Sequence, residues 1–213
     1  MPYFNTFYNK RKARRTIKGV ELLGLAFADL PEPLLFVPVE LRRDGMKLDL
    51  GGIAKGFAAD EGLAVLAKHG IRSALVGLAG DIAVAEPPPG ESGWTVAVAP
   101  EGSSTTTAVR RVRLCRQAIS TSGDAEQYVE IAGVRYSHIV NPRTGIGLTH
   151  RGSVTVIAPK GMLADSLASA ACVLGPQAGA KLIDSTPGAA GAYRAIDGQG
   201  RERWTESAGM DQY

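Results

Sequence analysis

The sequence has little cysteine and histidine, and it lacks any long apolar run. It holds two cysteines and three histidines in 213 residues. Cys115 and Cys172 are far apart and each stands in an apolar stretch, so small buried side chains are favoured over a disulfide or a metal pair. No apolar run approaches the roughly 18 residues that a membrane-spanning helix needs, so no membrane span is expected. With 45% apolar and 21% charged residues, the composition is typical of a globular domain with one core.

Acidic residues are absent from the first twenty positions, where basic residues gather. The net charge is +3, but six basic residues before Glu21 leave residues 19–213 with a net charge of −3. Such an arm binds nucleic acid or an anionic membrane in some proteins, and is more often a solvated tail. The remainder has no basic stripe, so nucleic acid is not an expected partner. The six basic residues are Lys10, Arg11, Lys12, Arg14, Arg15 and Lys18.

Strand and helix patterns together predict a single α+β domain after a basic N-terminal arm. Residues 1–18 are aperiodic and expected to be irregular, and we place the arm and a divergent segment at 1–44 and the domain at 45–213. Helical periodicity predicts helices at residues 53–68 and 162–174, and another that ends near residue 184. Strands are expected at 37–41, 46–50, 73–78, 94–99, 108–114, 118–121, 127–131, 134–136, 153–158, 193–196 and 203–205. The strand at 73–78 is expected to end at Gly80-Asp81, a loop is expected at 102–107, and Ala132-Gly133 indicates a hairpin turn.

The most informative stretch is Asp49-Leu50-Gly51-Gly52, where an apolar strand is expected to run into a helix. The first N–H groups of a helix have no partner within it, and glycine lets a ligand approach the backbone closely. The junction therefore suits a phosphate-bearing ligand. A tight turn with an aspartate beside it explains the same residues, and the spacing fits neither Gly-x-Gly-x-x-Gly nor a P-loop. The buried stripe expected on the following helix is Ala59, Leu63 and Leu66.

Two polar residues interrupt the alanine-rich helix expected at 162–174. Asp165 and Ser169 are four residues apart, so their oxygens lie on one helix face, as a Mg²⁺ site requires. The spacing alone favours another interpretation, in which Asp165 complements the helix N-terminus and Ser169 is a small packing residue. His138 precedes a Pro-Arg-Thr-Gly turn. Histidine can take a proton from a hydroxyl near neutral pH, although a loop histidine is more often a surface residue.

Five stretches in a fixed order resemble the signature motifs of the ApbE family of flavin transferases. They are residues 49–60 (DLGGIAKGFAAD), 75–81 (LVGLAGD), 120–124 (STSGD), 136–145 (YSHIVNPRTG) and 164–170 (ADSLASA). The resemblance covers about residues 45–205 and implies mixed, largely antiparallel sheets packed with helices, related to the T-fold. Residues 1–44 match poorly, so the N-terminal part is expected to be short or missing. A fragment, a truncated product and a divergent short form are left open.

The resemblance also implies roles for individual residues. Magnesium would be held by a backbone oxygen of Gly52, by Asp165 and by Ser169, which replaces the threonine usual in the family. His138 would be the catalytic base. Asn141 stands where aspartate is common. The implied flavin contacts are Asp49, Gly51, Gly52, Lys55, Gly80, Asp81, Ser122, Gly123 and Ile139, the last through its backbone.

Each of these contacts has a structural alternative. Asp49 suits a cap for the following helix, Lys55 a solvated position, and Ser122-Gly123-Asp124 a simple turn.

The implied activity is Mg²⁺-dependent transfer of FMN from FAD to a Thr or Ser hydroxyl of a flavoprotein, with release of AMP. The implied acceptors are electron-transfer subunits of the Nqr or Rnf kind, and a homodimer is admitted. An FAD pyrophosphatase and a non-catalytic FAD-binding module are the alternatives. Family members are usually periplasmic or membrane-associated. No signal peptide is visible, so the sequence leaves a cytoplasmic location open.

Overall fold

The computed structural model describes residues 13–17, 20–26, 35–36, 39–41, 44–45, 48–98, 110–124 and 127–213. The chain divides into two compact units, Met1–Asp49 and Leu50–Tyr213. In the first unit β2 (Val20–Ala26) pairs antiparallel with β1 (Ala13–Ile17), β3 (Leu35–Phe36) and β4 (Val39–Leu41). The expectation that residues 1–18 are irregular was therefore wrong for β1. The side chains of the basic arm lie outside the described residues.

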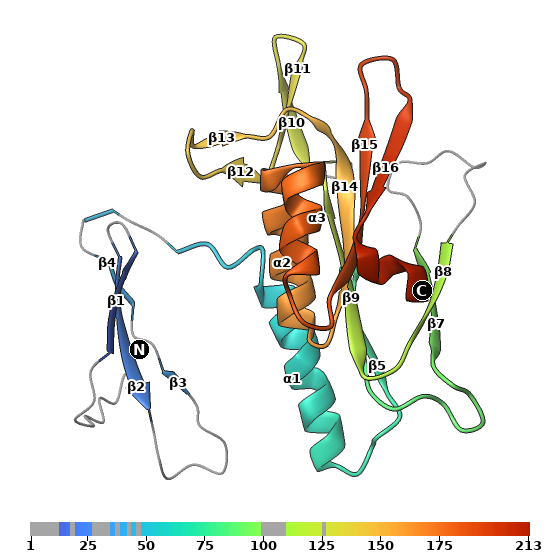
Figure 1. Cartoon of the computed structure of the whole chain (residues 1–213). Helices are drawn as coiled ribbons and strands as arrows, with labels where there is room; N and C mark the ends of the chain where they lie inside the picture. The colour runs from blue at the N-terminus through green and yellow to red at the C-terminus, as the bar shows by residue number, and fades with distance from the viewer. Residues whose placement is uncertain are drawn as a thin grey trace. The chain divides into compact units, whose positions relative to one another are not determined.

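The second unit is built on a six-stranded antiparallel sheet with the strand order β16-β15-β14-β9-β6-β5 (Figure 1). This sheet and the helices packed on it confirm the predicted α+β class. Its strands are β5 (Leu75–Leu78), β6 (Asp81–Val84), β9 (Gln117–Gly123), β14 (Arg151–Ala158), β15 (Ala190–Ile196) and β16 (Glu202–Glu206).

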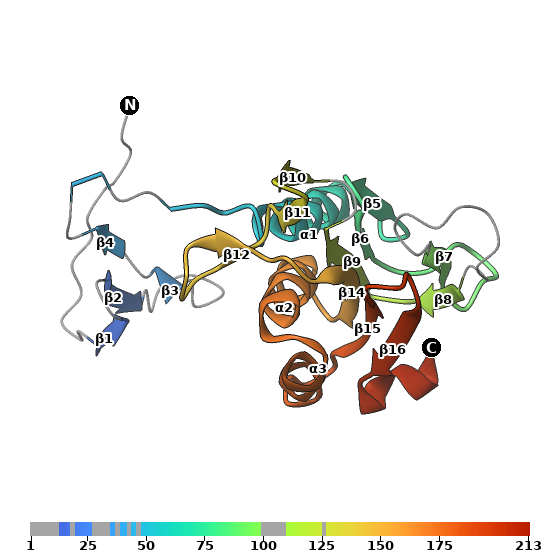
Figure 2. The same ribbon diagram turned by 90° about the horizontal axis from the view of Figure 1, so that it is seen from above.

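Both faces of this sheet are covered. The helices α1 (Ala54–Lys68), α2 (Gly161–Leu174) and α3 (Pro176–Asp184) lie on one face, and the hairpin of β7 (Trp94–Val98) and β8 (Arg110–Leu114) lies on the other (Figure 2). A short 3-10 helix, Ala208–Gln212, joins that second layer. Successive strand residues point to opposite faces, so β14 sends Val154 and Val156 into the helical core and Ile157 into the other. Burial on both faces explains the continuous apolar run that predicted this strand.

Two small hairpins extend from the sheet. In the first, β10 (Tyr128–Ile131) pairs with β11 (Val134–Ser137) across Ala132 and Gly133, whose φ angles are 50° and 76°. Positive φ at both turn residues matches the twist of antiparallel strands, and the hairpin predicted at these two residues is confirmed. In the second, β12 (Val140–Asn141) pairs with β13 (Ile146–Gly147). No helix among the described residues is both long and apolar enough to cross a membrane.

The strand β6 is a feature that the sequence interpretation missed. The sequence predicts that a strand ends at Gly80-Asp81, whereas Asp81 begins a new strand. Ala79 and Gly80, with φ angles of 46° and 96°, make a two-residue turn, and Leu78 pairs directly with Asp81. The reversal is so tight that the two strands read as one apolar stretch. Its consequence is that Asp81 stands inside the sheet, with a buried side chain.

Three other local predictions were wrong. Residues 48–50 of the strand expected at 46–50 are not in a strand, and residues 46 and 47 lie outside the described part of the chain. Ser122 and Gly123 belong to β9, so the alternative in which they form only a turn fails. Cys115 is exposed just after β8, whereas Cys172 is buried in α2 as expected, and both are free thiols. The loop expected at residues 102–107 lies outside the described residues.

Candidate functional site

Helices α1 and α2 cross at two glycines. A Cβ atom built on Gly56 would lie 2.1 Å from the carbonyl oxygen of Gly161, and one built on Gly161 would lie 2.5 Å from the carbonyl oxygen of Gly56. No side chain fits in such a gap, so the two backbones touch. The glycine of the Ala-Lys-Gly motif thereby brings the first turn of α1 against the first turn of α2.

Each of these helices caps the N-terminus of the other. The carboxylate of Asp165, in α2, accepts the N–H of Gly56 at 3.1 Å through Oδ2. The carboxylate of Asp60, in α1, accepts the N–H groups of Gly161 at 2.8 Å and Met162 at 3.0 Å. The residue before each helix makes no side-chain cap bond. The two aspartates therefore satisfy N–H groups that would otherwise lack partners, and the Gly56 N–H in the first turn of α1 is not free to bind a phosphate.

Removing the cap on α2 is expected to weaken the fold measurably. Asp60→Ala deletes both acceptors at the start of α2 and should lower the free energy of unfolding by about 1–2 kcal/mol. Urea denaturation followed by circular dichroism measures this. The matched control is Glu61→Ala, at the next and exposed position, which should change stability by less than about 0.5 kcal/mol. Equal stability of the two variants would contradict the capping role.

Two buried carboxylates and one lysine lie beside this crossing. Asp165 is 1% exposed and Asp81 is 2% exposed. The Nζ of Lys55 lies 3.2 Å from Oδ2 of Asp81, and Ser120 donates a hydrogen bond of 2.7 Å to its Oδ1. Lys55 is thus paired rather than merely solvated. The Lys55 ammonium is the partner of Oδ2 of Asp81, which accepts no other hydrogen bond within the described part of the chain. Two buried carboxylates against one ammonium leave an excess of negative charge that a bound cation would offset.

The surroundings of Asp165 shift its titration. Burial raises the pKa of its carboxyl above the ordinary 3.8, while the hydrogen bond from Gly56 lowers the pKa. The charge of Asp81 raises it and that of Lys55 lowers it, and the net shift is upward. A raised pKa means that the negative form is held at a cost in free energy. A divalent cation next to this carboxylate would favour the charged form.

This shift predicts how stability depends on pH. The folded state holds the Asp165 proton more tightly than the unfolded chain, so its contribution is fully present below the ordinary pKa of 3.8 and is lost as pH rises through the raised pKa. In buffers without divalent ions, we expect the free energy of unfolding to fall across this window in the wild type. The Asp165→Asn variant should lack this pH-dependent fall in the free energy of unfolding. Urea titrations at a series of pH values test it, and parallel curves for the two proteins would contradict it.

Ser169 and Ser122 place two hydroxyl oxygens near Asp165 and Gly52. The Oγ of Ser169 lies 3.1 Å from Oγ of Ser122, and a Cβ atom built on Gly52 would lie 3.1 Å from the Ser169 oxygen. Asp165 lies one helical turn earlier on α2, on the same face. The structure therefore brings together Gly52, Asp165 and Ser169, the three residues expected to hold a metal. Ser122 joins them.

These residues fit a hard cation. A carboxylate, a hydroxyl and a peptide carbonyl are oxygen donors of the kind that Mg²⁺ prefers. In the described ranges no three His, Cys, Asp or Glu side chains gather as a metal cluster. An ion here would depend on the hydroxyl of Ser169 and a backbone oxygen of Gly52 as well as on carboxylates.

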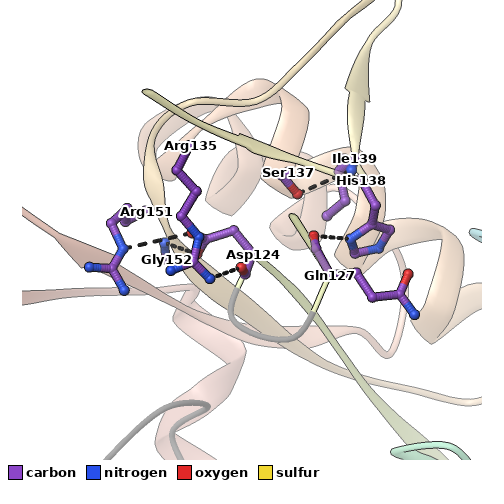
Figure 3. Close-up of polar contacts among 8 residues, drawn as sticks. All are labelled: Asp124, Gln127, Arg135, Ser137, His138, Ile139, Arg151 and Gly152. Carbon is purple, nitrogen blue, oxygen red and sulfur yellow. Dashed lines mark hydrogen bonds and ion pairs between the residues drawn. The ribbon is translucent and has the colours of Figure 1, made fainter. Parts of the chain in front are cut away.

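His138 is exposed at the end of β11, with its ring orientation fixed (Figure 3). Its backbone N–H and its ring Nδ1 each lie 3.1 Å from the carbonyl oxygen of Gln127. A carbonyl oxygen only accepts hydrogen bonds, so Nδ1 carries the hydrogen in the neutral ring. The lone pair is then on Nε2. This tautomer is suited to a general base that takes a proton at Nε2.

The region around His138 holds two further predicted residues. The N–H of Ile139 donates to Oγ of Ser137 at 3.1 Å, so it is already bonded within the chain. The Ile139 carbonyl accepts the N–H of Leu148 at 2.9 Å. Asn141 accepts the N–H of Arg143 at 2.9 Å through Oδ1 and closes the Pro-Arg-Thr-Gly turn. Asparagine and aspartate both form such turns, so the asparagine at this position preserves the turn.

The remaining residues predicted to contact flavin are three glycines and Asp49. Gly51 is exposed next to Gly52, and Gly80 is exposed in the turn that precedes Asp81. Gly123 is buried in β9, where it pairs with Ser153 of β14. Asp49 is exposed and belongs to the first unit. The N-cap residue of α1 is Ile53 rather than Asp49.

The sequence did not single out two aspartates that stabilise the fold. Asp60 caps α2, and Asp124 is a buried carboxylate at the end of β9 that holds two arginines. Each one closes a motif, residues 49–60 and 120–124 respectively. A polar residue at the end of an otherwise small and apolar motif was the available signal.

The fold and the site define a class: an antiparallel α+β domain with an oxygen-rich site where the starts of two helices meet. The model of the ApbE family matches residues 9–193, and the chain belongs to this family. The match begins within the first unit. The expectation that the resemblance begins near residue 45 was therefore wrong.

Known proteins resemble the chain over much of its length. The FAD:protein FMN transferase of Treponema pallidum is 40% identical over 161 residues, which cover 70% of this chain and 44% of that protein. The one of Vibrio cholerae is 32% identical over 178 residues, 81% of this chain and 49% of that protein.

Solved structures of flavin transferases are also similar to this chain. The flavin transferase ApbE from Vibrio cholerae has a TM-score of 0.71 at 27% identity, covering 82% of this chain and 55% of that one. The apo flavinyl transferase ApbE of Pseudomonas stutzeri has a TM-score of 0.65 at 34% identity, covering 78% and 51%. The chain spans about half the length of the relatives it matches.

Proposed function

We propose that this chain acts as a Mg²⁺-dependent FAD:protein FMN transferase, which moves FMN from FAD to a Thr or Ser hydroxyl and releases AMP. The observation that carries the proposal is the convergence of Gly52, Asp165 and Ser169 at the meeting of α1 and α2. The names of the relatives, FAD:protein FMN transferase, support the same reaction. Because the chain spans about half of those proteins, the activity of this chain needs its own test.

Three residues would hold the metal ion, and a fourth would take the proton. Asp165, Ser169 and the carbonyl of Gly52 would hold Mg²⁺, which supplies positive charge to the pyrophosphate of FAD and to the departing AMP. The acceptor hydroxyl oxygen bonds to the phosphorus of the FMN half as the P–O bond to the AMP phosphate breaks. His138 takes the hydroxyl proton at Nε2. Lys55, which is 39% exposed beside Asp81, has an ammonium group near enough to this cluster to attract phosphate oxygens.

The direct test is incubation of the full chain with FAD, Mg²⁺ and an acceptor protein. We propose electron-transfer flavoproteins of the Nqr or Rnf kind as acceptors, and a periplasmic or membrane-associated setting for the reaction. Flavin fluorescence that stays on the acceptor after denaturation, together with AMP, supports transfer. Free FMN and AMP without labelled acceptor indicate an FAD pyrophosphatase. FAD binding by calorimetry without any AMP indicates a binding module and contradicts the proposal.

His138→Ala is expected to slow transfer far more than it weakens FAD binding. Loss of a general base typically costs about 10²–10⁴-fold in rate, so kcat should fall in that range. The dissociation constant of FAD, measured by calorimetry with Mg²⁺, should change little. The control is His69→Ala, which changes an exposed histidine at the C-terminus of α1. A pure loss of FAD affinity in His138→Ala would remove the base role.

A further inference from the structure

A buried carboxylate that the proposed reaction does not use lies at the foot of the hairpin that leads to His138. Asp124 is 6% exposed and follows directly after β9. Its Oδ1 accepts the N–H of Gly152 at 2.9 Å, which fixes it to β14. Its Oδ2 lies 3.3 Å from Nε of Arg135 and 3.8 Å from Nε of Arg151. Figure 3 shows both arginines turned toward this one carboxylate.

Arg135 links the hairpin to that carboxylate. It lies in β11 and also donates a hydrogen bond to the backbone carbonyl of Asp124. Its guanidinium lies 3.3 Å from the centre of the Tyr128 ring, in β10. The guanidinium therefore holds both strands of the hairpin and the end of β9 together. Because a guanidinium is planar and rigid, these contacts together restrict the position of the hairpin relative to β9.

The hairpin needs such an anchor because it has little core of its own. All four residues of β10 are exposed, and an isolated two-stranded hairpin is marginally stable in water. Ser137, at the end of β11, is buried and bonds to the backbone of Leu148. The anchor of Arg135 on Asp124 lies two residues earlier on the same strand.

The group that orients His138 lies close to this anchor in the chain. Gln127, whose carbonyl holds both the backbone and the ring of His138, stands three residues after Asp124 and just before β10. We infer that Asp124 and Arg135 are positioning residues for His138, which keep its ring in the tautomer with the free lone pair on Nε2. This inference rests on the proposed function for its kinetic consequence. Its structural part stands on the contacts alone.

The test compares the removal of two different partners of the same aspartate. Asp124→Asn keeps an oxygen for the Gly152 N–H but removes the charge that holds Arg135. Arg151→Gln removes the other arginine, which lies in β14 and outside the hairpin, and serves as the control. Nitrogen-15 NMR of histidine-labelled full-length protein reports the tautomer of His138, with the signal assigned by its loss in His138→Ala.

In the wild type and in Arg151→Gln, we expect the Nδ1–H tautomer of His138. In Asp124→Asn we expect a mixture of tautomers and a kcat for FMN transfer roughly tenfold lower, with unchanged FAD affinity. Arg135→Lys keeps the charge but loses the planar fork, and should fall between these two results.

A wild-type tautomer in Asp124→Asn would overturn the inference, even if that variant were less stable. An equal loss of kcat in Arg151→Gln and Asp124→Asn would also overturn it, because the effect would then come from general destabilisation. If the wild type itself transfers no FMN, the proposed function fails, and the NMR comparison still decides whether Asp124 and Arg135 orient His138.

Discussion

Asp165→Asn is expected to abolish Mg²⁺-dependent release of AMP from FAD while the domain stays folded. The asparagine keeps an oxygen that accepts the Gly56 N–H, now made by Asp165 at 3.1 Å. It loses the negative charge, which supplies most of the attraction between a carboxylate and a divalent cation. We expect turnover at saturating FAD to fall by about 10³-fold or more. AMP release, followed chromatographically over a range of Mg²⁺ concentrations, measures the effect.

The control for this variant lies on the same helix. Ser166→Ala removes a hydroxyl that bonds only locally, to the carbonyl of Leu163, and should leave both turnover and fold unchanged. Circular dichroism and the urea midpoint of each variant separate loss of metal from loss of structure. Full turnover in Asp165→Asn would remove Asp165 from the metal site and leave it only the role of a helix cap.

Gly56→Ala is expected to have the largest effect on stability of any single change at the site. Its methyl group would lie 2.1 Å from the carbonyl oxygen of Gly161, so α1 and α2 have to move apart. Overpacking of this kind costs typically about 1–3 kcal/mol, and more where the backbone is the obstacle. We expect a loss at the upper end, about 3 kcal/mol or more, and loss of metal-dependent turnover as Asp165 is drawn away from α1.

A glycine six residues further along the same helix provides the matched control. A Cβ atom on Gly62 would make an ordinary contact of 3.4 Å with the side chain of Val76. Gly62→Ala should therefore be neutral or stabilise the helix by up to about 1 kcal/mol. Urea unfolding curves of the two variants show whether steric overlap at the helix crossing or the higher helix propensity of alanine determines the change in stability. If Gly56→Ala were as stable as Gly62→Ala, the close crossing of the helices would be wrong.

The sequence predicted those elements whose signals are local. The helix at Ala54–Lys68 repeats apolar residues at helical spacing, with Ala59 buried and Leu63 and Leu66 partly buried, and the strand at Arg151–Ala158 is a dense apolar and β-branched run. The hairpin at Ala132-Gly133 was predicted because glycine adopts positive φ easily. The turn at Ala79-Gly80 is also an Ala-Gly pair with positive φ angles, but it concealed β6 because the sequence stays apolar on both sides of it, broken only by Asp81.

The site was harder to predict because its partners are far apart in the chain. Asp165 and Gly56 are separated by 109 residues, and Asp60 and Gly161 by 101. Spacing on α2 alone favoured a packing role for Ser169, and the family resemblance was needed to join it to Gly52. The capping exchange had one local sign: Ile53 and Lys160, the N-cap residues of α1 and α2, are poor cap formers. A helix start that lacks its own cap needs a partner from elsewhere in the fold.

The most direct measurement is anomalous diffraction from crystals of the full chain grown with FAD and Mn²⁺, which takes similar oxygen ligands to Mg²⁺. The account predicts one strong anomalous peak within bonding distance of the Asp165 carboxylate, the Ser169 hydroxyl and the Gly52 carbonyl, with the pyrophosphate of FAD completing the shell. A peak elsewhere on the chain, or bound FAD whose pyrophosphate lies away from these three residues, would contradict it.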